Sequence, residues 1–444
     1  MSRLRFPADF AWGSATASFQ IEGGVEERGQ CIWDDFCRWP GKVFEGDNGD
    51  VAVDHYHLYR ADVTLMARLG FRAYRFSVSW PRILKEGIGE VNDVGLDYYS
   101  RLVDELLEAG IEPYATLYHW DLPTALQRVG GWASRDTASR FVEYARIVAD
   151  RLGDRVHHWI THNEPWVVAM VGNLYGTHAP GWEDPGLALQ VGHHLLLSHG
   201  LAVPVIRQAS PGSQVGITLN LYPTYPATTS AEDLDAARIQ DGFSNRWFLD
   251  PVFKGHYPED IWALAGAQVP RVEQADLSII SRPIDFLGIN YYSRHLVASD
   301  PSGPMGVQTL HPEGEYTQMD WEVYPQGLTD ILTRVYADYS PRAIYVTENG
   351  CAYEDVLTSD GQVHDAKRTA YLRAHFAAAH KAIAQGVPLR GYFVWSLMDN
   401  FEWAYGYSRR FGIVYVDFQS LRRYPKDSAL FCQSVAQENA VVLN

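Results

Sequence analysis

Short apolar runs rich in β-branched and aromatic residues recur along the chain, and segments with helical periodicity lie between several of them. Apolar runs of this length, bounded by turn-forming residues, are typical of buried strands. Eight runs fit this description: Phe10–Ser18, Arg72–Trp80, Glu112–Trp120, Val156–Asn163, Gln214–Leu221, Ile284–Tyr292, Ala343–Glu348 and Leu389–Leu397. Eight strands alternating with helices predict an α/β fold, a (β/α)8 TIM barrel formed as a single domain by residues 1–444.

The helical segments between the runs end in a consistent way. The clearest are Val53–Leu69, Asp97–Ala109, Arg135–Leu152 and Arg368–Gln385. A glycine follows directly after each of them, which is a common helix stop because glycine adopts left-handed backbone angles without strain. Two longer connections, Tyr175–Gly186 and Ser299–Trp321, interrupt the regular spacing. Long loops on the carboxyl face of a barrel vary its specificity, so we expect these two to line the site, although simple exposed insertions would look the same.

Two of the apolar runs end in a glutamate. Glu164 precedes Pro165, which cannot continue a strand ladder, and Glu348 precedes the turn-forming pair Asn349 and Gly350. In a barrel the carboxyl ends of all strands meet on one face, where active sites lie. A single glutamate at a strand end is more often solvated or ion-paired. Two together provide what glycosidic-bond cleavage requires, one to protonate the leaving oxygen and one to attack or to activate water.

Other polar and aromatic side chains occupy the ends of the remaining runs. They are Gln20, Arg75, His119, Trp120, Asn163, Asn220, Asn290, Tyr292 and Trp395. Amide, imidazole, phenol, indole and guanidinium groups on one rim form a donor and acceptor set suited to neutral hydroxyls. Two of them have a structural alternative, since His119 would also suit a buried core position and Arg75 a buried ion pair. No phosphate-binding glycine loop is present in the sequence.

Composition narrows the functional classes further. The 37 basic and 54 acidic residues give a formal charge of −17, which argues against nucleic acid or anionic lipid as the main partner. The start lacks an apolar core of signal-peptide length, and no other run approaches the length of a membrane span, so we expect a cytoplasmic protein. The four cysteines show no metal-ligand spacing and are expected to be free thiols. The sequence therefore gives no reason to expect a metal or another cofactor.

Six segments, in order along the chain, resemble the signature segments of glycoside hydrolase family 1, the β-glucosidase family. They read Ala-Thr-Ala-Ser-Phe-Gln-Ile-Glu-Gly, Tyr-Arg-Phe-Ser-Val-Ser-Trp-Pro-Arg, Thr-Leu-Tyr-His-Trp-Asp-Leu-Pro, Thr-His-Asn-Glu-Pro, Gly-Ile-Asn-Tyr-Tyr and Val-Thr-Glu-Asn-Gly. The resemblance runs from Phe6 to about Ser428. It implies a retaining enzyme that cleaves terminal β-D-glycosyl residues through a covalent glycosyl-enzyme.

The resemblance also assigns roles to individual residues. Glu164 would be the acid and base, Glu348 the nucleophile, and Arg75 and Tyr292 the groups that hold Glu348 ionised. Sugar hydroxyls would be bound by Gln20, His119, Asn163, Glu402 and Trp403, above Trp395 as a stacking floor. Trp120, Asn220, Asn290 and Phe411 complete the expected substrate-binding set.

Glu402 carries the substrate prediction. A buried carboxylate would repel a phosphate dianion, which favours unphosphorylated sugars, with Glu402 bridging hydroxyls 4 and 6. Small β-glucosides and β-linked disaccharides such as cellobiose are then the expected partners, with β-galactosides and β-fucosides also accepted. Three alternatives stay open: 6-phospho-β-glycoside hydrolysis, a non-catalytic sugar-binding barrel, and transglycosylation. In the last, Trp166, Trp182 and Trp321 would bind an acceptor in place of water.

Overall fold

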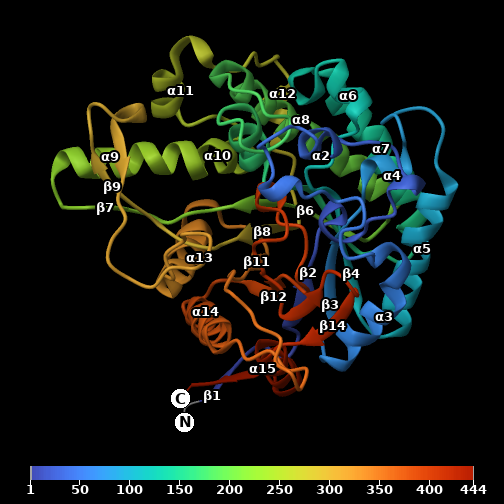
Figure 1. The fold of residues 1–444 in the computed structure, drawn as a ribbon. Helices are drawn as coiled ribbons and strands as arrows, with labels where there is room; N and C mark the ends of the chain where they lie inside the picture. Colours follow the sequence, from blue (N-terminus) through green and yellow to red (C-terminus); the bar gives the residue numbers. More distant parts are fainter. Residues whose placement is uncertain (1–2, 444) are drawn as a thin grey trace.

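Eight parallel strands close into a barrel at the centre of the molecule (Figure 1). The structure is a computed structural model that describes residues 3–443. The barrel strands are β2 (Ala11–Ala15), β3 (Ala73–Ser77), β4 (Glu112–Tyr118), β5 (His158–Asn163), β6 (Gln214–Asn220), β8 (Phe286–Asn290), β11 (Ile344–Asn349) and β12 (Leu389–Trp395). The first strand, β2, pairs in parallel with the last, β12, which closes the ring. The predicted (β/α)8 barrel is therefore confirmed.

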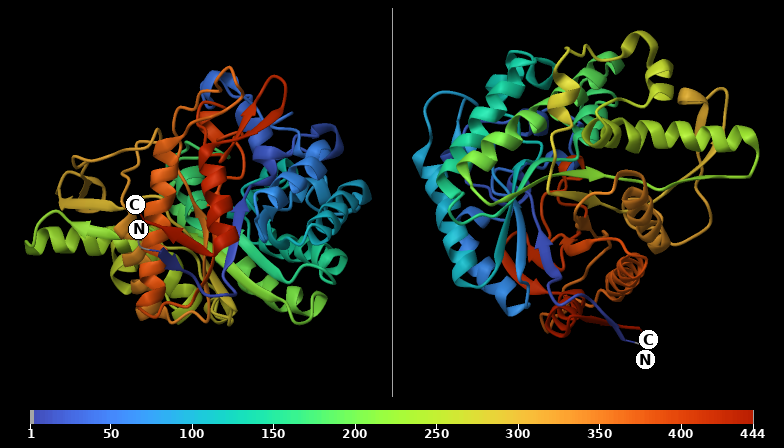
Figure 2. Two further views of the ribbon diagram at one scale, coloured as in Figure 1. Left: turned by 90° about the horizontal axis from the view of Figure 1, so that it is seen from below. Right: turned by 180° about the vertical axis from the view of Figure 1, so that it is seen from behind.

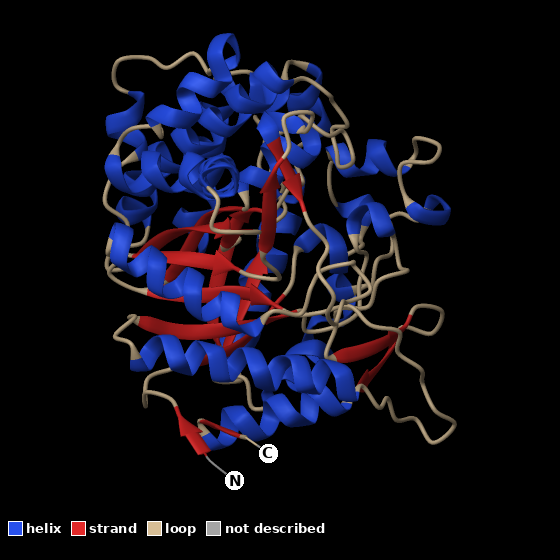
Figure 3. Cartoon of the chain, turned by 90° about the vertical axis from the view of Figure 1, so that its left-hand side faces the viewer, coloured by secondary structure: helices blue, strands red, loops and turns tan. Residues whose placement is uncertain are grey.

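Helices surround the barrel on its outside (Figure 3). The longer ones are α3 (His55–Arg68), α5 (Asp93–Glu108), α7 (Asp136–Leu152), α8 (Pro185–Ala209), α9 (Ala231–Asp241), α13 (Pro325–Tyr339), α14 (Ala366–Ala384) and α15 (Asp427–Glu438). Shorter ones are α1 (Ser18–Ile21), α2 (Ile32–Cys37), α4 (Trp80–Ile83), α6 (Thr124–Arg128), α10 (Trp247–Lys254), α11 (Glu259–Ala265) and α12 (Asp276–Ile280). Single turns include η4 (Val167–Val171) and η8 (Trp403–Tyr405). Each strand is nearly fully buried because helices cover its outer face.

Aromatic rings fill the end of the barrel where the strands begin. The ring of Tyr114 lies 4.1 Å from that of His158 and 4.8 Å from that of Phe393, and the ring of Phe286 lies 5.2 Å from that of Tyr345. Side chains packed in this way make the interior a solid core rather than a pore. The opposite end, where the strands finish, is therefore the end left for a site.

Three small sheets stand outside the barrel. One joins the two termini, β1 (Arg3–Arg5) beside β15 (Ala440–Val442), so that both ends of the described chain lie together (Figure 2). A second contains β7 (Thr224–Pro226), β9 (His295–Ser299) and β10 (Val307–Thr309), which lie beside α9 at the left of Figure 1. The third pairs β13 (Val414–Asp417) with β14 (Arg422–Pro425). The second sheet enlarges the carboxyl face of the barrel on one side.

The structure corrects some predicted boundaries. The first predicted strand runs too far, because β2 ends at Ala15 and Ser18 begins a helical turn that carries Gln20. The second also runs too far, since β3 ends at Ser77 and Trp80 begins α4. A short buried helical turn is as apolar as a strand, so the pattern could not separate the two. Helix α5 begins at Asp93, four residues before the predicted start.

Helix α8 corrects the statement that no segment is long enough to span a membrane. Within residues 3–443, its 25 residues form one helix whose length and composition would be sufficient to cross a bilayer. The most apolar 18-residue stretch of this helix is 78% buried inside the protein, and the helix packs against α7 and α12. The side chains of a helix that is covered on nearly every side are removed from water, as those of a membrane span are. Both kinds of helix are therefore apolar all round, and composition alone does not distinguish them.

Candidate active site

Glu348 ends β11 and is held by two donors. Nη1 of Arg75 donates to its Oε1 at 2.6 Å, and the hydroxyl of Tyr292 donates to its Oε2 at 2.7 Å. Arg75 stands on β3 and Tyr292 follows β8, so three strands converge on one carboxylate. All three side chains are buried. A charge-assisted bond to each oxygen stabilises the ionised carboxylate and fixes its orientation.

Glu164 follows β5 and faces the same end of the barrel. Nδ2 of Asn290 donates to its Oε1 at 2.7 Å, and the same Nδ2 lies 3.1 Å from Oδ1 of Asn163. Asn163 in turn accepts a bond of 2.7 Å from Nη2 of Arg75. Arg75, Asn163 and Asn290 therefore link the two glutamates through one continuous set of hydrogen bonds.

The two glutamates are stabilised to different extents. Burial, together with the charge of Glu348, raises the pKa of Glu164 to about 8. Burial raises the pKa of Glu348 as well, but the charge of Arg75 and the bonds from Tyr292 and Arg75 oppose that rise. Glu348 is thus the better stabilised anion, and Glu164 is the carboxyl that keeps a proton near neutral pH.

A third carboxylate, Glu402, lies beside Gln20. Nε2 of Gln20 lies 3.4 Å from Oε2 of Glu402, and it also donates to the carbonyl of Phe401 at 2.8 Å. His119 is placed nearby, since its ring lies 5.8 Å from the Trp395 ring and 6.0 Å from the Trp403 ring, nearly parallel to both. Residues that follow β2, β4 and β12 thereby meet at one wall of the site.

Nε2 of His119 lies 3.1 Å from Nδ2 of Asn163. Burial, followed by the charge of Arg75, lowers the pKa of His119 well below its usual value. A neutral imidazole nitrogen is able to accept a hydrogen bond from the amide N–H of Asn163, which fixes the direction of the asparagine side chain. Trp120 supports the same residue, because its indole N–H donates to the carbonyl of Asn163 at 3.1 Å.

The backbone around the site is strained at three residues. Trp120, Glu164 and Trp403 have φ angles of 78°, 48° and 49°, in the left-handed region that residues with a Cβ rarely adopt. Each such residue costs on the order of 1–3 kcal/mol and is tolerated where the surrounding structure holds it. At Glu164 the backbone N–H donates to the carbonyl of Thr218 at 2.9 Å, which holds the turn in place.

These side chains surround a cavity of about 340 Å³, which we call the inner cavity. Its lining residues are Trp120, Glu164, Trp166, Val167, Val171, Thr177, His178, Tyr222, Tyr292, Met319, Trp321, Glu402, Trp403, Ala404 and Tyr405. A volume of this size is enough for a small ligand. Glu164 and Glu402 thus reach the same concave space from opposite sides of the barrel.

Comparison with known proteins agrees with this site. The family model described as glycosyl hydrolase family 1 matches residues 2–441. The chain belongs to glycosyl hydrolase family 1. β-Glucosidase A of Thermotoga maritima is 49% identical over 99% of this chain and 100% of its own length. A bifunctional β-D-glucosidase/β-D-fucosidase of Bifidobacterium breve is 44% identical over 95% of this chain and 96% of its own.

Solved structures of family 1 enzymes have the same fold. The family 1 β-glucosidase from Thermotoga maritima matches with a TM-score of 0.97 at 49% identity, covering 100% of both chains. The same enzyme in complex with deoxynojirimycin also gives a TM-score of 0.97, over 99% of this chain and 100% of that one. The family membership and the glycoside hydrolase class predicted from the sequence are therefore confirmed.

The structure of this family 1 enzyme brings most of the predicted residues together. Trp120, Glu164, Tyr292, Glu402 and Trp403 line the inner cavity. Six further predicted residues are in hydrogen-bond or ring contact with these five: Gln20, His119, Asn163, Asn290, Glu348 and Phe411. Arg75 and Trp395 lie one contact farther out, Arg75 bonded to Glu348 and Trp395 stacked beside His119. Asn220 is buried at the end of β6, opposite Asn290 in the sheet register, and its side chain is hydrogen-bonded to Tyr222, which lines the inner cavity.

The two long loops behave as predicted in part. Thr177 and His178 of the first, and Met319 and Trp321 of the second, line the inner cavity. Trp182 is not among the residues that line it; its backbone N–H donates to the carbonyl of Gly172. Tyr222 also lines the inner cavity and was not predicted from the sequence. It stands two residues beyond Asn220, the end of β6, and this nearness to a strand end was the only sequence feature that could have indicated it.

The electrostatic argument for Glu402 needs a correction. Burial, followed by the charge of Glu348, raises the pKa of Glu402 to about 8, so near neutral pH Glu402 is mostly the neutral acid. A neutral carboxyl does not repel a phosphate dianion, and it is able to donate a hydrogen bond. The stronger argument is the absence of a cation, since no lysine or arginine is among the described residues that line the inner cavity.

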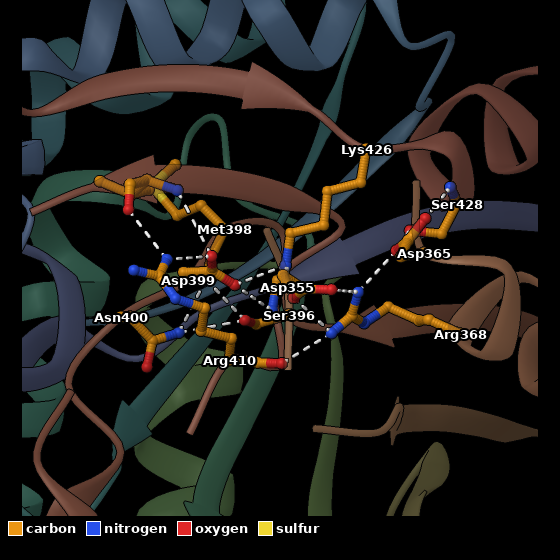
Figure 4. A network of polar contacts seen from close by, with 12 residues as sticks. Asp355, Asp365, Arg368, Ser396, Met398, Asp399, Asn400, Arg410, Lys426 and Ser428 are labelled. Atoms are coloured by element: carbon orange, nitrogen blue, oxygen red, sulfur yellow. Dashed lines mark hydrogen bonds and ion pairs between the residues drawn. The ribbon is translucent and has the colours of Figure 1, made fainter. Parts of the chain in front are cut away.

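A buried ion-pair network lies behind the segment that carries Glu402 (Figure 4). Lys426 donates to Asp399 at 2.8 Å and to Asp355 at 2.6 Å. Asp399 is three residues before Glu402, and Asp355 lies in the loop after β11, seven residues beyond Glu348. The network therefore ties together the two segments that carry Glu348 and Glu402.

Proposed function

We propose that this family 1 protein is a retaining β-glycosidase that removes terminal β-D-glucosyl residues from small β-glucosides. The observation that carries the proposal is the unequal support of the two glutamates. Arg75 and Tyr292 stabilise Glu348 as an anion, while Glu164 has a pKa of about 8 and keeps its proton. An ionised nucleophile beside a protonated acid is the starting state that the retaining reaction needs.

In the first step, an oxygen of Glu348 attacks the anomeric carbon, and the bond from that carbon to the leaving oxygen breaks. Glu164 donates its proton to the leaving oxygen, so the aglycone departs as a neutral alcohol. Asn163 is placed to bind the 2-hydroxyl, because its side chain is fixed by Arg75, Asn290 and His119. A bond to that hydroxyl strengthens as the transition state gains oxocarbenium character.

The second step depends on the change of charge at Glu348. Once its oxygen is esterified, Glu348 is neutral, and the second largest contribution to the raised pKa of Glu164 disappears. Glu164 then becomes a stronger acid and is left as a carboxylate. As a carboxylate it accepts a proton from water while the water oxygen attacks the anomeric carbon, which releases the sugar and restores Glu348.

The proposed sugar preference rests on Gln20 and Glu402. Glu402 would bridge hydroxyls 4 and 6, which tolerates either orientation at position 4, so β-galactosides and β-fucosides are accepted beside β-glucosides. A relative named for both glucosidase and fucosidase activity supports this. Cellobiose is the proposed disaccharide substrate, with a role in cellulose degradation. The four cysteines are buried free thiols, which supports action in the reducing cytoplasm.

The test compares initial rates on matched chromogenic β-glucoside, β-galactoside, β-fucoside and 6-phospho-β-glucoside. We expect turnover of the three unphosphorylated sugars, within about 100-fold of one another. Glu348→Gly should remove this turnover, and added azide or formate should restore part of it by replacing the missing nucleophile. The control is Glu90→Gly, which removes an exposed loop glutamate and should leave the rates unchanged.

Each other outcome contradicts a defined part of the proposal. Turnover of the phosphorylated sugar alone would favour the 6-phosphoglycosidase alternative. Binding of sugars without turnover of any glycoside would favour the non-catalytic barrel. A preference above 100-fold for one sugar would contradict the proposed role of Glu402 in accepting both orientations at position 4.

A further inference from the structure

Three of the six sequence segments described above contain polar side chains that have no part in the proposed reaction. Ser18 and Glu22 belong to the first segment, Ser77 to the second and Asp121 to the third. All four are buried, and none of them lines the inner cavity. They nevertheless meet around α1, the helical turn that carries Gln20.

Gln20 has one buried acceptor that is not used within the protein. Its Nε2 donates to the carbonyl of Phe401 at 2.8 Å and to Oδ1 of Asn400 at 3.0 Å. Its Oε1 is buried and has no hydrogen-bond partner among residues 3–443. A buried acceptor without a donor costs free energy, and a sugar hydroxyl would supply that donor. Because a hydrogen bond weakens within a few tenths of an ångström, the use of this oxygen depends on where α1 holds it.

The turn α1 is too short to hold its own position. It has four residues, and the residue before it provides no side-chain cap. Helices of this length are not stable in isolation. At its start, the backbone N–H of Ser18 donates to Oγ of Ser77 at 2.7 Å. Directly after its end, the carboxylate of Glu22 accepts bonds from Arg82 at 2.8 Å and from Tyr99 at 2.7 Å. Contacts from outside therefore fix α1 at both ends.

Asp121 adds a contact from a third segment of the chain. The hydroxyl of Ser18 donates to Oδ2 of Asp121 at 3.0 Å, and the hydroxyl of Ser77 donates to Oγ of Ser18 at 3.0 Å. Ser77 is the last residue of β3, and Asp121 follows Trp120 directly after β4. One chain of hydrogen bonds thus joins α1 to the end of β3 and to the segment that carries Trp120, which lines the inner cavity.

The carboxyl group of Asp121 is buried without a cation of its own. Burial raises the pKa of Asp121 to about 7. Arg28 is near enough for its charge to act on Asp121, but its guanidinium bonds both oxygens of Asp34, at 2.6 and 2.7 Å. A buried carboxyl group without a paired cation adds little to stability. The bond to Ser18 is therefore the contribution of Asp121 that the structure shows.

We propose that Asp121 is a positioning residue for Gln20: through the hydroxyl of Ser18 it fixes α1, so that Oε1 of Gln20 meets a hydroxyl of the glycosyl unit. The inference rests on the proposed β-glycosidase function, in which Gln20 binds the sugar. Asp121 itself does not touch the substrate. Without its bond to Ser18, α1 shifts, and the contact from Gln20 to the sugar lengthens.

The test is a double-mutant cycle on an aryl β-glucoside, with Asp121→Ala, Gln20→Ala and the two combined. Asp121→Ala should lower kcat/KM by about 10- to 100-fold, the range expected when a binding contact is misplaced by about 1 Å. Its loss should not exceed that of Gln20→Ala. If Asp121 acts through Gln20, the double variant should match Gln20→Ala within about 2-fold, whereas independent roles would multiply the two losses.

The conservative variant separates positioning from a general structural role. Asp121→Asn keeps an acceptor for the Ser18 hydroxyl and should retain kcat/KM within about 5-fold. Ser18→Ala removes the same bond from its other side and should resemble Asp121→Ala. The matched control is Asp233→Ala, since Asp233 is also a buried aspartate that accepts a hydroxyl bond, from Thr228, but lies on α9 outside the inner cavity. This control should leave kcat/KM unchanged.

Thermal unfolding shows whether each variant folds. If Asp121→Ala does not fold, Ser18→Ala takes its place in the cycle with Gln20→Ala, because it leaves the carboxyl group in position. Losses that multiply in the double variant would overturn the positioning role, and so would an Asp121→Asn variant as slow as Asp121→Ala. If the unaltered protein does not hydrolyse the aryl glucoside, the proposed function itself is wrong, which distinguishes the two failures.

Discussion

Two buried clusters of charge lie within the same end of this barrel, and they are balanced differently. The catalytic cluster holds three carboxylates around one cation: Glu164, Glu348, Glu402 and Arg75. The support network behind it holds three carboxylates with three cations: Asp355, Asp365, Asp399, Arg368, Arg410 and Lys426 (Figure 4). Except for Arg410, which is partly exposed, the side chains of both clusters are nearly inaccessible to water. They therefore differ in charge balance far more than in burial.

The difference in balance decides what each cluster does. In the support network, burial alone would raise the pKa of Asp355, but the charges of Arg368 and Lys426, together with the hydrogen bonds that both donate, lower it. In the catalytic cluster the balance is reversed, and Glu164 and Glu402 both have pKa values of about 8. Fully paired carboxylates stay ionised and hold segments together, whereas unpaired ones keep protons that a reaction is able to use.

The largest effect is expected from Lys426→Met, a substitution in the support network. It removes the cation that bonds both Asp355 and Asp399 and leaves two buried carboxylates short of a partner. We expect the free energy of unfolding to fall by about 3–5 kcal/mol, as is typical when a buried pair loses one member. Chemical denaturation monitored by tryptophan fluorescence measures it.

The exposed Lys381→Met serves as the control, since Lys381 donates only to Gln326. The pKa of Asp355 is lowered in the folded protein, so its stabilising effect is present above its unfolded pKa and is lost as pH falls through the folded one. In Lys426→Met part of that effect is gone, and acid unfolding should begin at a higher pH. Equal stability of the two lysine variants would show that the network is not balanced as described.

Arg75→Met tests the other cluster by removing its one cation. Glu348 then keeps the Tyr292 bond but loses the charge that opposes its burial. We expect kcat for an aryl β-glucoside to fall by about 10²–10³-fold, the usual cost of losing one preorganised electrostatic contact in an active site. The acidic limb of the kcat–pH profile should also move to higher pH, because Glu348 becomes harder to ionise.

Stopped assays across the pH range measure both effects, with thermal unfolding to verify that the variant folds. Arg146→Met, which alters an exposed pair with Asp150, is the matched control. A lower kcat with an unchanged acidic limb would mean that Arg75 acts by packing rather than through its charge.

The sequence was sufficient to predict the barrel and the catalytic cluster. Each barrel strand lies within one of the apolar-rich runs, and each expected polar residue stands within a few positions of a strand end. The position of such a residue in the sequence therefore indicates its place at the carboxyl face of the barrel. Glu164, Glu348 and Arg75 follow this rule. Gln20 does so only approximately, because a helical turn after β2 carries it.

The support network was not predictable in the same way. Lys426 pairs with Asp399 and Asp355, which are 27 and 71 residues away, and no periodicity connects such positions. A lysine near a helix start is usually exposed, so its complete burial has no local signal. The same holds for the pKa of Glu402, which depends on burial and on Glu348, 54 residues earlier in the chain. Properties that arise from distant neighbours require the folded structure.

The prediction with the smallest expected effect makes the same kind of substitution, a carboxyl to an amide, in each of the two clusters. Glu402→Gln removes a carboxyl whose folded pKa, about 8, lies above its ordinary value of 4.5. The stabilising contribution of such a group is complete below pH 4.5 and is lost as pH rises to 8, because the folded protein must bury an unpaired charge. The variant should therefore be more stable than the unaltered protein at pH 9, on the order of 1–3 kcal/mol, and similar to it at pH 5.

Asp399→Asn makes the same change in the support network, and its effect on stability should have the opposite sign. It leaves Lys426 and Arg410 each without one partner, so it should destabilise the protein at pH 7. Thermal unfolding of both variants at pH 5, 7 and 9 gives the comparison directly. A gain for Glu402→Gln with a loss for Asp399→Asn would mean that the catalytic cluster is kept at a cost in stability, as expected for a site selected for reactivity. A loss for both would mean that Glu402 is paired in solution, and the contrast between the clusters would then rest on Glu164 alone.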